Sequence, residues 1–176
     1  GAIIVYGEDN GGTTNLDLRA QRVNGAGVLQ WAGGSTAGVA VSTAFGSNAK
    51  TDDYICWSCG PWPGVGGVNN IITSAYIASD SAGGAFVIWQ DAQTRVYGQH
   101  LRPNGAVSWA ANGIQLASGG ADAITPWSII EGDNHTAIFA YAGAMDGVVM
   151  PTSFVYVSKI DTFGVQLWGA GGVRVS

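Results

Sequence analysis

The chain has 176 residues, of which 47% are hydrophobic, 10% are aromatic and only 11% are charged. Its 7 basic and 12 acidic residues give a net charge of −5, the wrong sign for binding a phosphate backbone. Plentiful aromatic residues exclude a disordered chain, the scarcity of Lys and Glu excludes a coiled coil, and the short apolar runs predict no membrane span. A globular domain with a real hydrophobic core remains.

One sequence unit occurs three times along the chain. In 23–31, 101–109 and 160–168 an aliphatic residue precedes a Trp by eight positions, and a Gly precedes the same Trp by four. Each copy is followed by a Gly-containing turn and a short alternating segment. Each is preceded by a hydrophobic segment. Repetition at this period is typical of propellers and solenoids.

The apolar runs in each copy are short, rich in β-branched and aromatic residues, and bounded by turn-forming residues, which predicts strands. The first copy begins directly at its second strand, 2–6. We expect strands of the second copy at about 72–79, 84–90, 94–102 and 106–117, and of the third at about 125–131, 136–142, 152–160 and 164–176.

Four strands per unit predict an all-β, propeller-like array of about three four-stranded antiparallel blades, the first of them incomplete. A solenoid or a sandwich of meanders is the alternative. We interpret 1–176 as a single repeat domain. Blade 1 spans about 1–42, an insertion covers 43–69, blade 2 spans about 70–117 and blade 3 spans about 124–176.

The second copy carries the most distinctive motifs. A Gly-Gly-Ala strand ends in Trp-x-Asp within 79–91, a Tyr-x-Gln strand lies in 96–101, and a Gly-x-x-x-Trp turn leads to the Asn-Gly-aliphatic sequence of 112–114. This pattern resembles a repeat of secreted and surface bacterial proteins. The resemblance implies propeller blades and an extracellular or cell-surface location, and it implies no catalytic residues. The third copy departs from it, because Ser158 stands in place of the Gln.

The insertion 43–69 contains most of the distinctive residues that do not recur, and Trp127, outside the insertion, is another. Cys56 and Cys59 lie in a Pro- and Gly-rich loop, which favours a local disulfide in an oxidising compartment over a redox pair at a helix start. Four further aromatic residues are candidate ligand-binding residues for a sugar ring or a protein surface, or alternatively a cluster that holds the loop down. They are Tyr54, Trp57, Trp62 and Trp127.

Recurring residues are expected to be structural. We expect Trp31, Trp109 and Trp168 to pack between blades. Acidic residues at turns, such as Asp80 and Asp91, form turns or bind a hard cation, and the turn interpretation is favoured.

The histidines give no catalytic pattern. His100 aligns with Arg22 and Lys159, which predicts a solvent-facing strand position rather than a metal ligand or a general base. We therefore expect no catalytic residue, no metal site and no cofactor.

The sequence predicts a non-enzymatic recognition or adhesion module of a secreted or cell-surface protein, with a glycan or protein surface as ligand. One alternative is a structural subunit of an extracellular assembly or filament, in which open strand edges pair with those of neighbours. A further alternative is a glycan-acting propeller hydrolase, which would need two carboxylates facing each other across a cleft.

Overall fold

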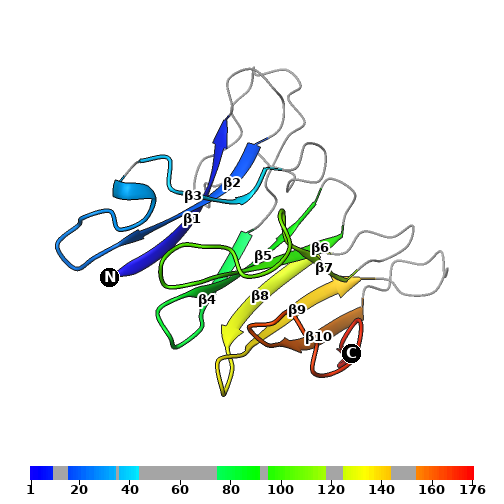
Figure 1. Cartoon of the computed structure of the whole chain (residues 1–176). Helices are drawn as coiled ribbons and strands as arrows, with labels where there is room; N and C mark the ends of the chain where they lie inside the picture. The colour runs from blue at the N-terminus through cyan, green and yellow to red at the C-terminus, as the bar shows by residue number, and fades with distance from the viewer. Residues whose placement is uncertain (10–15, 35, 44–74, 92–94, 118–124, 144–153) are drawn as a thin grey trace, which may run out of the picture.

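The computed structural model describes residues 1–9, 16–34, 36–43, 75–91, 95–117, 125–143 and 154–176. These residues form three antiparallel sheets, which confirms the all-β prediction (Figure 1). Sheet I contains β1 (Ala2–Asp9), β2 (Leu16–Val23) and β3 (Val39–Ser42). Sheet II contains β4 (Ala75–Ser79), β5 (Ala85–Gln90), β6 (Val96–Leu101) and β7 (Ile114–Ala117). Sheet III contains β8 (Thr125–Glu131), β9 (Ala137–Gly143), β10 (Phe154–Ile160) and β11 (Val173–Arg174).

The three sheets are copies of one meander. Sheets II and III have the strand orders β4-β5-β6-β7 and β8-β9-β10-β11, and sheet I has the order β1-β2-β3. Since β1 aligns with β5 and β9, sheet I lacks the opening strand of the other two sheets. The expectation of an incomplete first unit is confirmed within the described residues.

Two predicted strands are much shorter in the structure. The segment 106–117 is a strand only over β7, and 164–176 is a strand only over β11. Single bridges Leu101↔Val107 and Ile160↔Gln166 replace the ladder at the start of each segment. Positive φ angles at Gly105 and Gly164 turn the chain there, and the residues that follow lie outside the regular ladder until β7 and β11 begin.

A buried glutamine shapes the turn in the first two units. The Oε1 atom of Gln99 accepts hydrogen bonds from the backbone N–H groups of His100, at 3.0 Å, and Trp109, at 2.9 Å. Gln21 does the same for Arg22 and Trp31, at 2.9 Å each. In each of these two units the Gln side chain thus links its strand to the Trp that follows the turn. It accepts hydrogen bonds from two backbone N–H groups that have no partner in the β-ladder.

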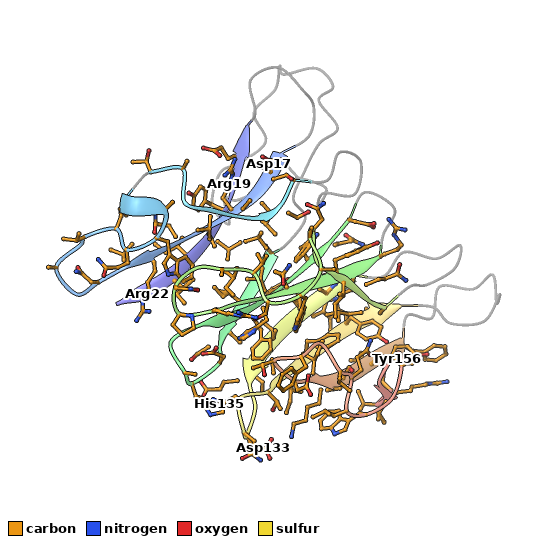
Figure 2. All side chains as sticks on the ribbon, viewed as in Figure 1. Asp17, Arg19, Arg22, Asp133, His135 and Tyr156 are labelled. Carbon is orange, nitrogen blue, oxygen red and sulfur yellow. The ribbon has the colours of Figure 1, made fainter. Side chains whose placement is uncertain are left out.

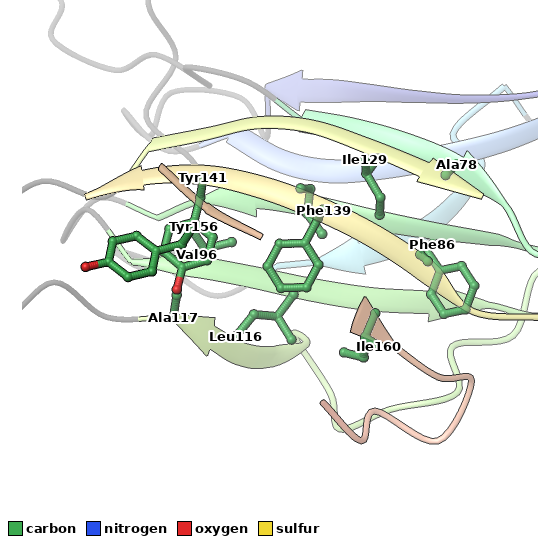
Figure 3. Close-up of a cluster of buried hydrophobic side chains, with 12 residues drawn as sticks. Ala78, Phe86, Val96, Leu116, Ala117, Ile129, Phe139, Tyr141, Tyr156 and Ile160 are labelled. Atoms are coloured by element: carbon green, nitrogen blue, oxygen red, sulfur yellow. The ribbon is translucent and has the colours of Figure 1, made fainter. Parts of the chain in front are cut away.

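The hydrophobic core lies between sheets. Sheets I and II enclose one buried cluster, which contains Leu18, Ala20, Trp31, Val41, Val87, Trp89 and Leu101. Sheets II and III enclose the other, drawn in Figure 3, which includes Phe86, Ile88, Leu116, Phe139, Tyr141 and Ile160. Every residue of β5 is buried, because sheet II is covered on both faces.

Successive sheets are joined by the same polar contact, which we call the Trp–turn contact. The indole Nε1–H of Trp31 donates to the carbonyl of Pro103 in sheet II's turn at 2.9 Å. The Nε1–H of Trp109 donates to the equivalent carbonyl, that of Thr162, at 2.9 Å. A Cβ atom added to Gly105 would lie 2.8 Å from the Trp31 ring. The glycine is therefore needed for the close approach of the indole as well as for its positive φ.

Replacing Gly105 by Ala should destabilise the protein more than the equivalent change at Gly27. Both glycines have positive φ, +85° and +80°, so each substitution costs about 1–2 kcal/mol of backbone strain. Only Gly105→Ala adds a clash with an indole, which should cost roughly a further 1–3 kcal/mol. Urea unfolding at low protein concentration measures both free energies. Equal losses would contradict a packing role for Gly105.

Candidate functional site

The two ends of the sheets differ in construction. At one end, short turns with repeated hydrogen bonds join the strands, as at 24–28, 102–106 and 161–165. At the other end, the connections are 10–15, 43–74, 91–95, 118–124 and 144–153, of very unequal length. Figure 1 shows the strand ends that lead into these connections on one side of the molecule. We call the two sides the turn end and the loop end.

Of the four predicted ligand-binding residues, the structure describes one. Tyr54, Trp57 and Trp62 lie outside the described residues, as do Cys56 and Cys59 of the predicted disulfide. Trp127 is described: it lies near the loop end of β8, and 51% of its surface is exposed. A large aromatic side chain left this open on a strand is available to a ligand.

At the turn end, Asp80 organises the connection between β4 and β5. Its Oδ1 atom accepts hydrogen bonds from the N–H groups of Ala82 and Gly84, each at 2.8 Å. Its Oδ2 atom lies 2.9 Å from Nε2 of His100 on β6. Both side chains are buried. The Asp80 carboxylate therefore stabilises the β4–β5 turn and links this turn to β6.

The prediction that His100 faces solvent is wrong. Only 5% of its surface is exposed, and its ring lies 4.7 Å from that of Phe86. The aligned Arg22 explains the error, because its guanidinium donates to the carbonyls of Gly83, at 3.3 Å, and Pro103, at 3.2 Å, in the next sheet. In sheets II and III the residue at this position, His100 or Lys159, instead bonds to an acidic side chain at a turn of its own sheet, so the position faces turn residues rather than open solvent (Figure 2, Arg22).

A hollow of about 430 Å³ opens between the turns of sheets II and III. Its polar lining comes mainly from Asp80, His100, Arg102, Ser108 and His135. The Nδ1 atom of His135 lies 2.7 Å from the carbonyl oxygen of Asp80, which joins the β8–β9 turn to the β4–β5 turn. Figure 2 shows His135 and Asp133 together on that turn of sheet III.

Several polar groups of this hollow are engaged in structural bonds. The Ser108 hydroxyl accepts a hydrogen bond from Nε of Arg102 at 2.9 Å, and within the described residues no serine hydroxyl bonds to His100. His100 Nδ1 is buried and has no hydrogen-bond partner in the described structure.

Other acidic side chains at turns also pair with basic ones. Asp91 accepts from the backbone N–H of Arg95 at 2.8 Å and from its Nε at 2.6 Å. Lys159 donates to Asp133, and this bond lowers the pKa of the Asp133 carboxyl. No group of three or more His, Cys, Asp or Glu side chains gathers in the described parts of the chain. These geometries favour the turn interpretation of Asp80, Asp91 and Asp133.

The recurring tryptophans do not share one environment. Trp31 is buried and Trp109 is half-buried, so the packing prediction is confirmed for both. Trp168 is 42% exposed, which contradicts the prediction. The reason is that sheet III is the last described sheet, so no turn lies opposite Trp168. Sequence comparison among the copies could not reveal this difference, because all three tryptophans occupy the same place in the repeat.

Comparison of the chain with protein-family models, with curated proteins and with solved structures finds no match. In the described part of the chain, no helix has the length and hydropathy required to cross a membrane.

Acid should weaken the fold through Asp80. Burial raises the pKa of this carboxyl, but hydrogen bonds from His100, Ala82 and Gly84 outweigh burial and hold the pKa below its usual 3.8. A carboxyl whose folded pKa is lowered stabilises the protein above its unfolded pKa, and this stabilisation disappears as pH falls through the folded value. The unfolding free energy of the wild type should therefore decrease more below about pH 4 than that of Asp80→Asn.

Denaturant unfolding from neutral to acid pH measures this difference. Asp161→Asn is the matched control. Asp161 also accepts two turn N–H bonds, at 2.9 Å each, and within the described residues it has no histidine partner. Parallel pH dependences of the wild type and Asp80→Asn would contradict the role assigned to Asp80.

Proposed function

We propose that this chain is a non-enzymatic recognition module of a secreted or cell-surface protein, with its sheets arranged as propeller-type blades. Its ligand is a glycan or a protein surface that docks on the loop end. The observation that carries the proposal is the difference between the two ends of the sheets. Short turns with the same hydrogen bonds recur at the turn end, whereas the connections at the loop end differ in length. Binding residues concentrate on loops that a rigid scaffold positions.

The packing of the sheets supports the blade arrangement. β1 lies against β4, and β4 lies against β8, so the described strands nearest the start of each unit are neighbours across the sheets. Sheet II is covered on both faces, and the same Trp–turn contact joins each sheet to the next. Propellers place the first strands of successive blades around a common axis in this way, with four to eight blades needed for closure.

The chemistry at the loop end supports recognition. Trp127 is the aromatic side chain with large exposure on that side of the described structure, and the insertion 43–69 emerges between β3 and β4 at the same end. Aromatic faces with few surrounding charges suit the apolar faces of sugar rings or an apolar protein patch. At the turn end, by contrast, the carboxylates and histidines hold turns together, which supports a non-enzymatic function.

Binding should depend on Trp127 and on the aromatic residues of the insertion. Trp127→Ala, Trp57→Ala and Trp62→Ala should each weaken binding to immobilised glycans or surface proteins by about tenfold or more. Trp127→Ala should change the unfolding free energy by less than about 0.5 kcal/mol, because the side chain is half exposed.

The control is Phe163→Ala, which removes an 86% exposed aromatic side chain from the turn end. Biolayer interferometry against a panel of purified polysaccharides and glycoproteins gives the affinities, and thermal unfolding checks the fold. If the wild type binds no member of the panel, or if Phe163→Ala lowers affinity as much as the loop-end variants, recognition at the loop end is wrong.

A further inference from the structure

The first and last described sheets each carry one unused partner of a Trp–turn contact: a turn in sheet I and a Trp indole in sheet III. Trp168 occupies the donor position of Trp31 and Trp109, and its indole N–H has no acceptor among the described residues. Gly27 occupies the position of Gly105 and Gly164, with the same positive φ. A Cβ atom on Gly27 would meet no described atom within 4 Å, whereas one on Gly105 would strike Trp31. The Trp168 donor and the surface at Gly27 that would receive an indole ring are thus both present, and no described residue occupies either.

The donor face of sheet III is apolar. Val157, Trp168, Val173 and Val175 line a shallow groove there of about 540 Å³. The equivalent positions in sheet I include Trp31, Val39 and Val41, all packed against sheet II. In sheet II they include Trp109, Ile114 and Leu116, packed against sheet III. This face is therefore the one that each sheet turns toward its successor, and in sheet III it is exposed.

The receiving face belongs to sheet I. Ile4 on β1 is 50% exposed and aligns with Val87 and Phe139, which are buried against the preceding sheet. The carbonyl of Gly25 holds the position of the two acceptors, those of Pro103 and Thr162. Sheet I differs in one respect. Arg19, paired with Glu8 at 2.9 Å, replaces the tyrosines Tyr97 and Tyr156 of the other units. The exposed face of sheet I is thus more polar than the corresponding faces of sheets II and III, which pack against the preceding sheet.

We infer that sheet III of one molecule docks on sheet I of a second copy of this chain, head to tail. The Trp168 indole donates to the Gly25 carbonyl of the second copy, its ring rests on Gly27, and Val173 and Val175 cover Ile4. The evidence is continuity with the two internal interfaces, which use the same residues in the same order. The inference goes beyond ligand recognition, since it concerns the ends of the stack rather than the loop end.

This contact is heterologous, because each molecule offers two different surfaces. Repetition of a heterologous contact produces a closed ring when the rotation per molecule completes a circle, and an open filament otherwise. It also differs from association through strand edges, because it buries sheet faces and adds no strand to any ladder.

Blocked variants test both the contact and its direction. Val173→Arg places a charge on the donor face, and Ile4→Arg places one on the receiving face, at positions that are 49% and 50% exposed. Each variant alone should sediment as a monomer, because one of its two surfaces is closed. An equimolar mixture should form a heterodimer and nothing larger, because one open donor face then meets one open receiving face. The wild type should form larger species as concentration rises.

The control is Phe163→Arg, which charges an exposed apolar side chain of sheet III outside the donor groove and should associate like the wild type. Circular dichroism confirms that each variant folds, and Val175→Lys replaces Val173→Arg if that variant does not. Trp168→Phe keeps an aromatic ring but loses the N–H donor, and should weaken association about fivefold. The indole N–H resonance of Trp168 should shift on mixing.

Three results would overturn the inference. A dimer of Ile4→Arg alone would show that two donor faces pair with each other. A mixture that stays monomeric at the concentrations at which the wild type associates would show that another surface is used. A wild type that is monomeric up to its solubility limit would show that no such docking occurs.

Discussion

The architecture depends on an indole N–H that reaches across to a carbonyl in the next sheet's turn. A sheet of three or four strands has two faces and cannot bury either alone, so each sheet needs a neighbour. Apolar burial supplies most of the stabilisation but has no direction. The bond from Trp31 to Pro103, repeated from Trp109 to Thr162, supplies the direction, because its length and the glycine beneath the ring fix one spacing and one register.

The glutamine on the third strand of the complete unit prepares that contact. Leaving the ladder to place a Trp costs two backbone hydrogen bonds, and Gln99 replaces both with a single oxygen. In the third unit Ser158 is too short for this task. There its hydroxyl bonds to Gln166, whose amide in turn donates to the carbonyl of Leu116 in sheet II at 2.9 Å. The same turn is therefore supported by a different pair of side chains.

The two ends of the molecule follow from this arrangement. The turn end is constrained, because its turns carry the contacts between sheets and its charged residues, such as Asp80 and Arg22, bond to backbone atoms of those turns. At the loop end the connections differ widely in length. Under the proposed function, the sequence of these connections serves a ligand, and the aromatic residues that do not recur are its binding residues. The open donor face of sheet III is a consequence of the same repetition.

The local structure could be predicted from the order of residues along the chain. Alternating β-branched and aromatic residues between Gly, Asn and Asp turns placed β4 to β6 and β8 to β10 within a few residues, because these preferences act between neighbours along the chain. The same order of residues also showed the missing strand of the first unit. The surroundings of each side chain could not be predicted in this way, because they depend on how the sheets pack. Trp31 and Trp168 share a motif, yet one is buried and the other exposed, and His100 lies inside where its aligned position predicted solvent. The burial of a side chain depends on which sheet packs against it. Equivalent positions of a sequence repeat look alike whether or not another sheet covers them.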